Sequence, residues 1–159
     1  MATQLVMYEE EFQKINAVCD RLTKDANAKV VFLVDKNGQL ISAAGQTHNI
    51  DTTSLASLTA GNVAAMGGLA KLIGENEFPN QFHEGARDSL YMTLVGGRVV
   101  LVVIFDNRTS LGLVRLRIKK ASDELEKVFV AVASRAQVPG AGSPFAEISD
   151  ADIDNLFSE

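Results

Sequence analysis

The sequence predicts an α+β sandwich with a mostly antiparallel sheet, built in the order helix, two strands, helix, two or three strands, helix. Three observations predict this class. Long segments repeat apolar residues at helical spacing, the shorter runs between them are rich in Val and Leu, and glycine-containing turns join neighbouring strands as hairpins. With 159 residues, 47% of them hydrophobic, the chain has enough apolar material for the core of one domain.

The first helix is expected over residues 8–24, because bulky apolar side chains recur there at steps of four and three. Acidic residues near its start and a lysine near its end suit the helix dipole. The run 28–35 is apolar almost throughout, which predicts a strand buried on both faces. Asn37-Gly38 then supplies the positive φ angles of a tight turn, so a second strand is expected from Leu40.

A second helix is expected to begin at a cap formed by Asp51 or Thr52 and to stop at Gly74. At about 100° per residue, its larger apolar side chains share one face and its small residues cluster roughly opposite. The larger side chains are Leu55, Leu58, Met66, Leu69 and Ile73. The small-residue cluster comprises Ala56, Ala60, Ala64, Gly67 and Gly68, together with Lys71. Residues 52–70 contain no ionisable side chain, although a surface helix normally carries Lys and Glu on its outer face.

The rest of the domain is predicted to be two or three strands followed by a long helix. The predicted segments are a loop at 74–81, a short strand at 82–85, and strands at 90–95 and 98–105. Gly96-Gly97 is expected to form the hairpin turn between the last two strands. Ser110 is expected to cap the third helix, which ends near Arg135.

The sequence divides into a domain at 1–135, a flexible linker at 136–144 and an acidic tail at 145–159. In the tail, Ser149 and Asp152 match a capping box at the start of a short amphipathic helix. The apolar side chains expected to dock in a groove on a partner are Ile148, Ile153, Leu156 and Phe157. A disordered tail is the alternative.

Composition and motifs argue against catalysis, nucleic-acid binding and membrane insertion. The formal charge of −5 disfavours DNA and RNA, and no stretch is long and apolar enough to span a bilayer. Cys19 lies on the apolar stripe of the first helix, and His48 and His83 complete no catalytic arrangement. The P-loop pattern of a GTPase is absent, and the aspartates at 150–154 lack the glycine of a calcium loop. We therefore expect no catalytic site, cofactor or metal, and a cytoplasmic location.

The uncharged second helix has two explanations. It either lies buried within the monomer, between the sheet and another helix, or it presents its outer face to another protein. A domain with three long helices has little left with which to cover both sides of one of them, which favours the intermolecular surface. Gly67 and Gly68 each cost about 1 kcal/mol relative to alanine inside a helix, and close approach by a neighbour would offset that cost.

The element order and residues 61–68, Gly-Asn-Val-Ala-Ala-Met-Gly-Gly, resemble the Roadblock/dynein light chain family over roughly residues 5–135. Within that family, residues 7–25, 30–38 and 78–82 and the closing tail resemble bacterial members that regulate a Ras-like GTPase in cell polarity and gliding motility. The resemblance implies a Roadblock-type fold and a homodimer that pairs its second helices and joins its sheets edge to edge. It also implies a small GTPase bound on the helix pair, and it places the small-residue cluster at the dimer or GTPase surface.

The resemblance further implies that the GTP-loaded partner is activated by ordering of its switch regions. The alternative is an arginine supplied in trans, for which Arg108 in the loop 106–109 is the candidate, although its flanks also suit an ordinary turn. A basic cluster early in the third helix predicts either a solvated face or electrostatic contacts with an acidic surface. Its members are Arg115, Arg117, Lys119 and Lys120. Two other functions stay open: a dimeric scaffold that leaves hydrolysis unchanged, and a small-molecule sensor.

Overall fold

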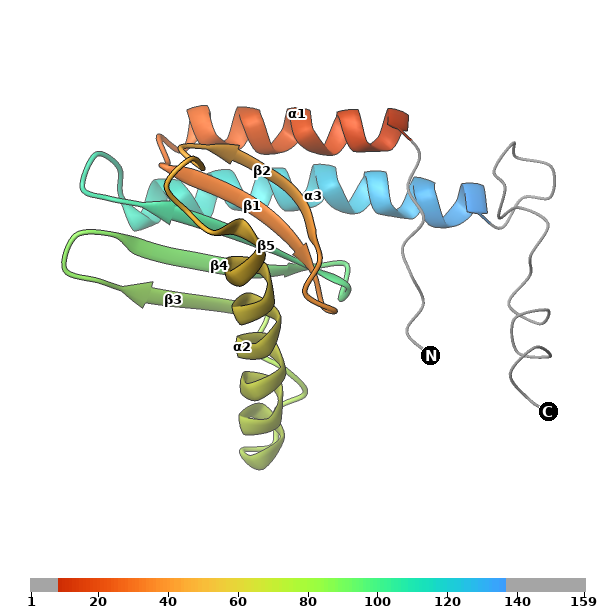
Figure 1. The fold of residues 1–159 in the computed structure, drawn as a ribbon. Coiled ribbons are helices and arrows are strands. Elements are labelled where there is room, and N and C mark those ends of the chain that lie inside the picture. Colours follow the sequence, from red (N-terminus) through yellow and green to blue (C-terminus); the bar gives the residue numbers. More distant parts are fainter. Residues whose placement is uncertain (1–8, 137–159) are drawn as a thin grey trace.

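The computed structural model describes residues 9–136, which form three helices and a five-stranded sheet (Figure 1). In chain order the elements are α1 (Glu9–Asp25), β1 (Val30–Asp35), β2 (Leu40–Gly45), α2 (Thr52–Leu72), β3 (Asn80–Glu84), β4 (Ser89–Val95), β5 (Val99–Phe105) and α3 (Leu111–Ala136). This order confirms the predicted α+β fold. Over these residues, no helix has the length and apolar character needed to cross a membrane.

The strands lie in the order β2-β1-β5-β4-β3, and every neighbouring pair is antiparallel. The central strands β1 and β5 are buried along nearly their whole length, which explains their almost continuous apolar sequences. Gly38 has φ +92°, and Gly96 and Gly97 have φ +60° and +70°, so the predicted turn residues adopt backbone angles that favour glycine. The hairpin turns therefore set the antiparallel topology.

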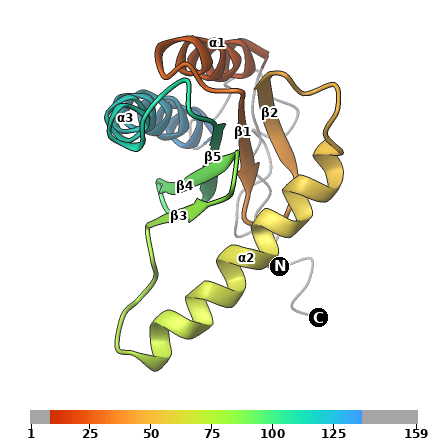
Figure 2. The same ribbon diagram turned by 90° about the vertical axis from the view of Figure 1, so that its left-hand side faces the viewer.

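Helices α1 and α3 lie side by side on one face of the sheet, and α2 crosses the other face (Figures 1 and 2). Alternate residues of β1 divide between two cores: Val31 and Leu33 pack beneath α1 and α3, whereas Phe32 packs beneath α2. The first core is covered by two helices. The second is covered by part of one helix, which leaves much of α2 without a neighbour in its own chain.

The face of α2 that groups its larger apolar side chains is not buried as a unit. Leu58, Leu69 and Ile73 are exposed, whereas Ala56 is buried against the sheet. The physical reason is the close approach of the β1–β2 turn: a Cβ added to Gly38 would lie 3.7 Å from Cβ of Ala60. A turn this close to the helix requires small side chains beneath it, and the leucines therefore lie on other sides of α2.

Two smaller differences concern element ends. β3 begins at Asn80, inside the predicted loop, because Leu94 donates its backbone N–H to the Pro79 carbonyl at 2.9 Å and Thr93 Oγ1 donates to Asn80 Oδ1 at 2.7 Å. β2 extends to Gly45. The predicted tail at 145–159, and Tyr8 at the start of the first predicted helix, lie outside the described residues.

Candidate interaction surface

Both ends of α2 are closed by the predicted capping residues. The Asp51 side chain accepts hydrogen bonds from Ser54 Oγ at 2.7 Å and from Ser54 N at 3.1 Å, and these bonds lower the pKa of Asp51. At the other end Gly74 has φ +86° and donates to the Lys71 carbonyl, while Glu75 N donates to the Ala70 carbonyl at 2.9 Å. The helix is therefore well defined up to its end, including the part that projects from the domain.

Helix α2 and the residue that follows it carry exposed apolar side chains, most of them in the second half of the helix. Leu58 is 73% exposed and Leu72 is 85% exposed, and Leu69 and Ile73 are exposed as well. Figure 2 shows the second half of α2 extending past the β3 side of the sheet. Exposed apolar residues gathered on one uncharged helix are typical of a surface that another molecule covers.

The structure divides the small-residue cluster. Ala64, Gly68 and Lys71 are exposed, while Ala60 and Gly67 are half-buried. A Cβ added to Gly67 or Gly68 would meet no described atom within 4 Å, so their own chain gives no packing reason for glycine. The sixth residue, Ala56, is only 1% exposed, and its side chain has no surface to offer a partner, contrary to the prediction.

The outer edge of β3 lies on the same side of the molecule as the projecting half of α2 (Figure 2). Within the described part of the chain, β3 pairs with β4 alone. Phe82 of this strand stacks on Phe105, with ring centroids 6.2 Å apart, yet is 39% exposed. An unpaired strand edge and an uncovered apolar helix therefore face the same way.

Comparisons with known proteins agree with this fold. The Roadblock/LC7 domain family matches residues 14–105. The chain belongs to this family. It is 91% identical to Myxococcus xanthus MglB, with a TM-score of 0.77 over 80% of this chain and 96% of that one.

Two further Roadblock structures show the same fold at lower identity. The gliding protein MglB of Thermus thermophilus is 30% identical, with a TM-score of 0.76 over 82% of this chain and 99% of that one. A structure described as MglB with a tetrameric arrangement is 29% identical, with a TM-score of 0.77 over 83% of this chain and 99% of that one. A comparison with curated protein sequences gave no match.

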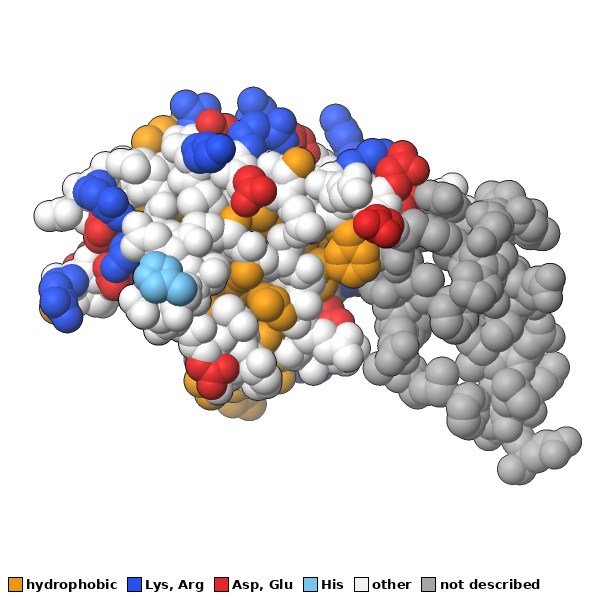
Figure 3. Space-filling model, turned by 45° about the horizontal axis from the view of Figure 1, so that its top comes forward, with side chains coloured by type: hydrophobic (Ala, Val, Ile, Leu, Met, Phe, Trp, Pro, Cys, Tyr) orange, Lys and Arg blue, Asp and Glu red, His pale blue; other side chains and the backbone are white. Residues whose placement is uncertain are grey.

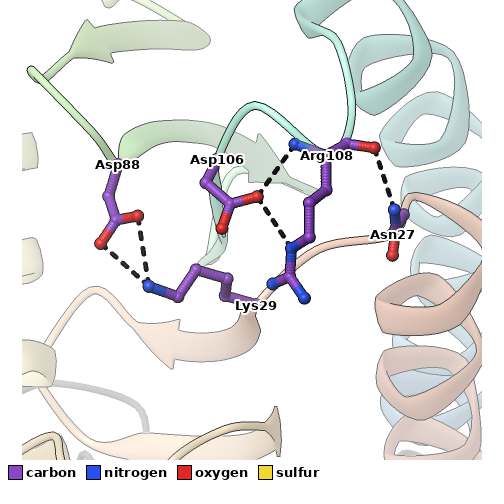
Figure 4. Close-up of polar contacts among 5 residues, drawn as sticks. All are labelled: Asn27, Lys29, Asp88, Asp106 and Arg108. Atoms are coloured by element: carbon purple, nitrogen blue, oxygen red, sulfur yellow. Dashed lines mark hydrogen bonds and ion pairs between the residues drawn. The ribbon is translucent and has the colours of Figure 1, made fainter.

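Arg108, the candidate arginine of this Roadblock domain, is held by its own loop (Figure 4). Its Nε and backbone N–H donate to Asp106 Oδ1 at 3.0 and 3.1 Å, and its carbonyl accepts from Asn27 Nδ2 at 2.9 Å. Hydrogen bonds from Arg108 lower the pKa of Asp106, and the bond from its backbone N–H has a larger effect than the bond from its side chain. Nearby, Lys29 Nζ lies 3.1 Å from a carboxylate oxygen of Asp88. The Asn27 contact ties the loop to the connection between α1 and β1, and the bonds within the loop fit the ordinary-turn interpretation of its sequence.

The structure does not bring the predicted basic cluster of α3 onto one face. Arg117 and Lys120 line a shallow groove against α1, where Arg21 also pairs with Glu124, whereas Arg115 and Lys119 are exposed outside this groove. Figure 3 shows Lys and Arg side chains along the upper edge and left end of the face that it presents. The four residues of the predicted cluster belong to α3, which lies on the opposite side of the sheet from α2.

The remaining candidate groups give no reactive constellation in the described chain. Cys19 is buried, and burial raises the pKa of its thiol to about 11, which suits core packing. Within residues 9–136, no group of three or more His, Cys, Asp or Glu side chains could hold a metal ion. The aspartates at 150–154 and the docking residues predicted in the tail lie outside the described residues.

The sequence reasoning missed the exposed leucines of α2 and the edge residue Phe82. Apolar residues occur on several sides of α2, so periodicity could not decide which side meets the sheet. Counting elements could have helped, because one helix cannot cover the whole second face of a five-stranded sheet. For Phe82, the available signal was an aromatic residue in a short strand that is less apolar than the other predicted strands.

Proposed function

We propose that this chain is a homodimeric, GTPase-activating partner of a small Ras-like GTPase. It binds the GTP-loaded form, orders the switch regions and thereby stimulates hydrolysis, in bacterial cell polarity and gliding motility. The 91% identity to Myxococcus xanthus MglB and the description of the Thermus relative as a gliding protein support this role. The chain supplies no catalytic group of its own under this proposal and acts in the cytoplasm.

The observation that carries the proposal is the projecting half of α2, in which Lys71 is the one ionisable residue. A second copy covers part of its apolar surface by lying alongside, and the GTPase lies on the remaining surface. The glycines suit this arrangement because they let a partner backbone approach closely without displacing any atom of their own chain. We assign Ala60, Ala64, Gly67, Gly68 and Lys71 to this combined dimer and GTPase surface.

Switch ordering is favoured over an inserted arginine by the contacts of Arg108. A residue whose Nε and backbone atoms are bonded to its own loop and to the connection between α1 and β1 would have to break those bonds to reach a partner. In Figure 1 its loop lies at the left end of the sheet, level with β1 and β2, whereas α2 projects below the sheet. The acceleration therefore comes from positioning the GTPase's own catalytic groups.

Two further contacts belong to the proposal. Arg115, Lys119 and Lys120 provide electrostatic contacts with an acidic surface, on the layer opposite α2. Ile148, Ile153, Leu156 and Phe157 of the tail dock in a groove of the partner and tune affinity or nucleotide exchange. Tail truncation after residue 136 is expected to change these quantities while the fold of the domain is kept.

Single-turnover GTP hydrolysis by a purified cognate Ras-like GTPase, with and without this chain, tests the function. Acceleration by both the parent and Arg108→Ala supports switch ordering, whereas acceleration by the parent alone indicates an arginine finger. Binding without acceleration indicates a scaffold. Ala64→Arg and Gly68→Arg should abolish binding, and Ala17→Arg is the matched control because Ala17 is exposed on α1, in the other layer. Intact binding by both α2 variants would contradict the surface assignment.

A further inference from the structure

The shallow groove between α1 and α3 holds more basic than acidic side chains. The charged residues that line it are Arg21 and Asp25 of α1, and Arg117, Lys120 and Glu124 of α3. Arg21 pairs with Glu124, whereas Arg117 and Lys120 form no salt bridge with any described residue. Residues 111–120 of α3 contain basic residues and no acidic ones, so Asp25 offsets only part of this charge. The groove therefore attracts an anionic ligand.

Arg117 is well placed to bind a carboxylate. Its side chain is half-buried against α1, and its Nε is buried without a hydrogen-bond partner among the described residues. A guanidinium held in one place loses little side-chain freedom on binding, and its planar donors match a carboxylate. Lys120 follows one turn later on the same face of α3, with Cβ atoms about 5 to 6 Å apart at this spacing. The groove therefore suits a ligand that offers two carboxylates about one helical turn apart.

The acidic tail of the chain offers carboxylates at this spacing. Residues 137–159 include five acidic residues and no Lys or Arg. The short helix predicted in the tail places Asp150 and Asp154 one turn apart on the same side. We propose that, in the protein without its GTPase, the tail docks on the groove of its own chain through these two aspartates. The inference goes beyond the proposed function, because it gives the tail a second binding site, on Arg117 and Lys120.

The tail is long enough to reach the groove of its own chain. Lys120 lies 16 residues before the end of α3 at Ala136, which is about 24 Å along the helix. The 13 residues from 137 to 149 span up to about 43 Å when extended. A tethered segment has an effective concentration on the order of millimolar, so that modest ion pairs are enough to hold it. These lengths favour the tail of the same chain as the occupant.

The charges of α1 direct the tail toward the groove. In Figure 1, α1 begins on the side of the molecule where α3 ends, and the first turn of α1 contains Glu9, Glu10 and Glu11. Like charges repel an acidic segment that leaves α3 at this end, whereas the basic groove lies further back along α3. The field of this layer therefore favours the groove over the nearer surface.

A spin label near the end of the tail maps its binding site in the full chain. Ser158→Cys carries the label, and the native Cys19 stays unlabelled because it is buried and burial raises the pKa of its thiol to about 11. We expect the label to broaden the backbone amide NMR signals of Arg21 and Lys120 and to leave that of Gly68 in α2 unchanged. Raising the salt concentration from about 0.1 M to about 1 M shortens the screening length from about 10 Å to about 3 Å, which should remove most of the broadening.

Charge reversal in the groove tests the two basic residues. Arg117→Glu with Lys120→Glu should lower the ratio of docked to free tail at least about fivefold, which corresponds to about 1 kcal/mol for two partly exposed ion pairs. Arg115→Glu with Lys119→Glu is the matched control, because it changes the net charge equally at exposed positions outside the groove. The control should leave the broadening in place.

A change in the tail keeps the proposal testable if the groove variant fails to fold. Asp150→Lys with Asp154→Lys should lower the ratio of docked to free tail to the same extent, and combining it with the groove reversal should restore docking. Broadening on another surface, no broadening, or broadening that survives both reversals would overturn the proposal.

Mixed samples distinguish the tail of the same chain from that of a second copy. Spin-labelled chains without isotope are mixed with isotope-labelled chains that carry no spin label, and we expect no broadening in the groove. Broadening in this mixture would place the tail on the second copy and overturn docking within one chain. These samples contain no GTPase, so failure of this docking and failure of the proposed GTPase activation are separate results.

Discussion

Leu72 is the most exposed large apolar residue of α2, with 85% of its surface open to solvent. Replacing it with alanine should leave the isolated domain as stable as before, because the side chain buries little within its own chain and alanine is the best helix former. In a homodimer that covers the end of α2, the same change should weaken association. A core residue would behave differently, because its replacement by alanine would also destabilise the isolated domain.

The magnitude follows from the area that association would cover. Leu72→Ala removes three carbon atoms, and each buried carbon contributes about 0.8 kcal/mol, so each copy loses about 1 to 2 kcal/mol if most of the side chain becomes buried. Two-fold symmetry doubles the loss to about 2 to 4 kcal/mol per dimer. Since 1.4 kcal/mol corresponds to a factor of ten, the dimer dissociation constant should rise roughly 30-fold to 700-fold.

Sedimentation equilibrium over a concentration series measures this constant, and urea unfolding at concentrations below it measures the stability of the monomer. Leu116→Ala is the matched control, because Leu116 is 61% exposed on α3, in the layer away from α2. The control should leave both quantities unchanged. A dissociation constant for Leu72→Ala within about threefold of the parent would refute the reasoning, since it corresponds to under about 0.7 kcal/mol.

Other residues give predictions of different kinds. Because burial raises the folded-state pKa of Cys19 from 9.0 to about 11, stability should fall as pH rises through that window, by up to about 1.4 kcal/mol per unit, and urea unfolding of Cys19→Ala should lack this slope. The hydrogen bonds from Ser54 lower the pKa of Asp51 in the folded chain. The cap should therefore stabilise α2 above about pH 4, and this stabilisation should be lost as pH falls through the lowered pKa of Asp51. Circular dichroism of Asp51→Ala should lack this acid dependence. Gly45→Ala should cost at least about 2 kcal/mol in urea unfolding, because its Cβ would lie 2.3 Å from a backbone carbonyl oxygen at φ +90°. Gly68→Ala should instead stabilise the monomer by about 0.5 to 1 kcal/mol and weaken the dimer or GTPase complex, and equal or tighter binding would show that no partner approaches there.

Most of the fold could be predicted because its signals are local. Asn37-Gly38 and Gly96-Gly97 have conformational requirements that hold wherever they occur, and the structure places positive φ angles at three of these four residues. Ser110 Oγ accepts from Leu113 N at 3.2 Å, as an N-cap should, and Asp51 does the same for α2. Turns and caps fixed the element order, and hairpins then required antiparallel neighbours.

The orientation of α2 could not be predicted from its periodicity. A helix with one apolar stripe buries that stripe, but α2 has large apolar residues on more than one side: Leu55 packs against the sheet, whereas Leu58 and Leu72 are exposed. The choice was decided by a tertiary contact, the packing of the Gly38 turn against Ala60, which accepts small side chains and excludes leucine. The division of the α3 basic cluster has a similar origin. The packing of α1 against α3 places some of the basic side chains in the groove between the two helices and leaves the others exposed outside it.

The absence of charge in α2 is better understood as a property of an assembly than of a single chain. In isolation, the exposed leucines contribute no burial energy to the folded domain, and the two helical glycines, which have no neighbour in the described residues, destabilise the helix. Both become favourable when another backbone lies against the helix, since the leucines are then buried and the glycines permit the close approach. The exposed leucines and the glycines of α2 therefore indicate the surface that a partner covers, and the free edge of β3 lies on the same side of the molecule.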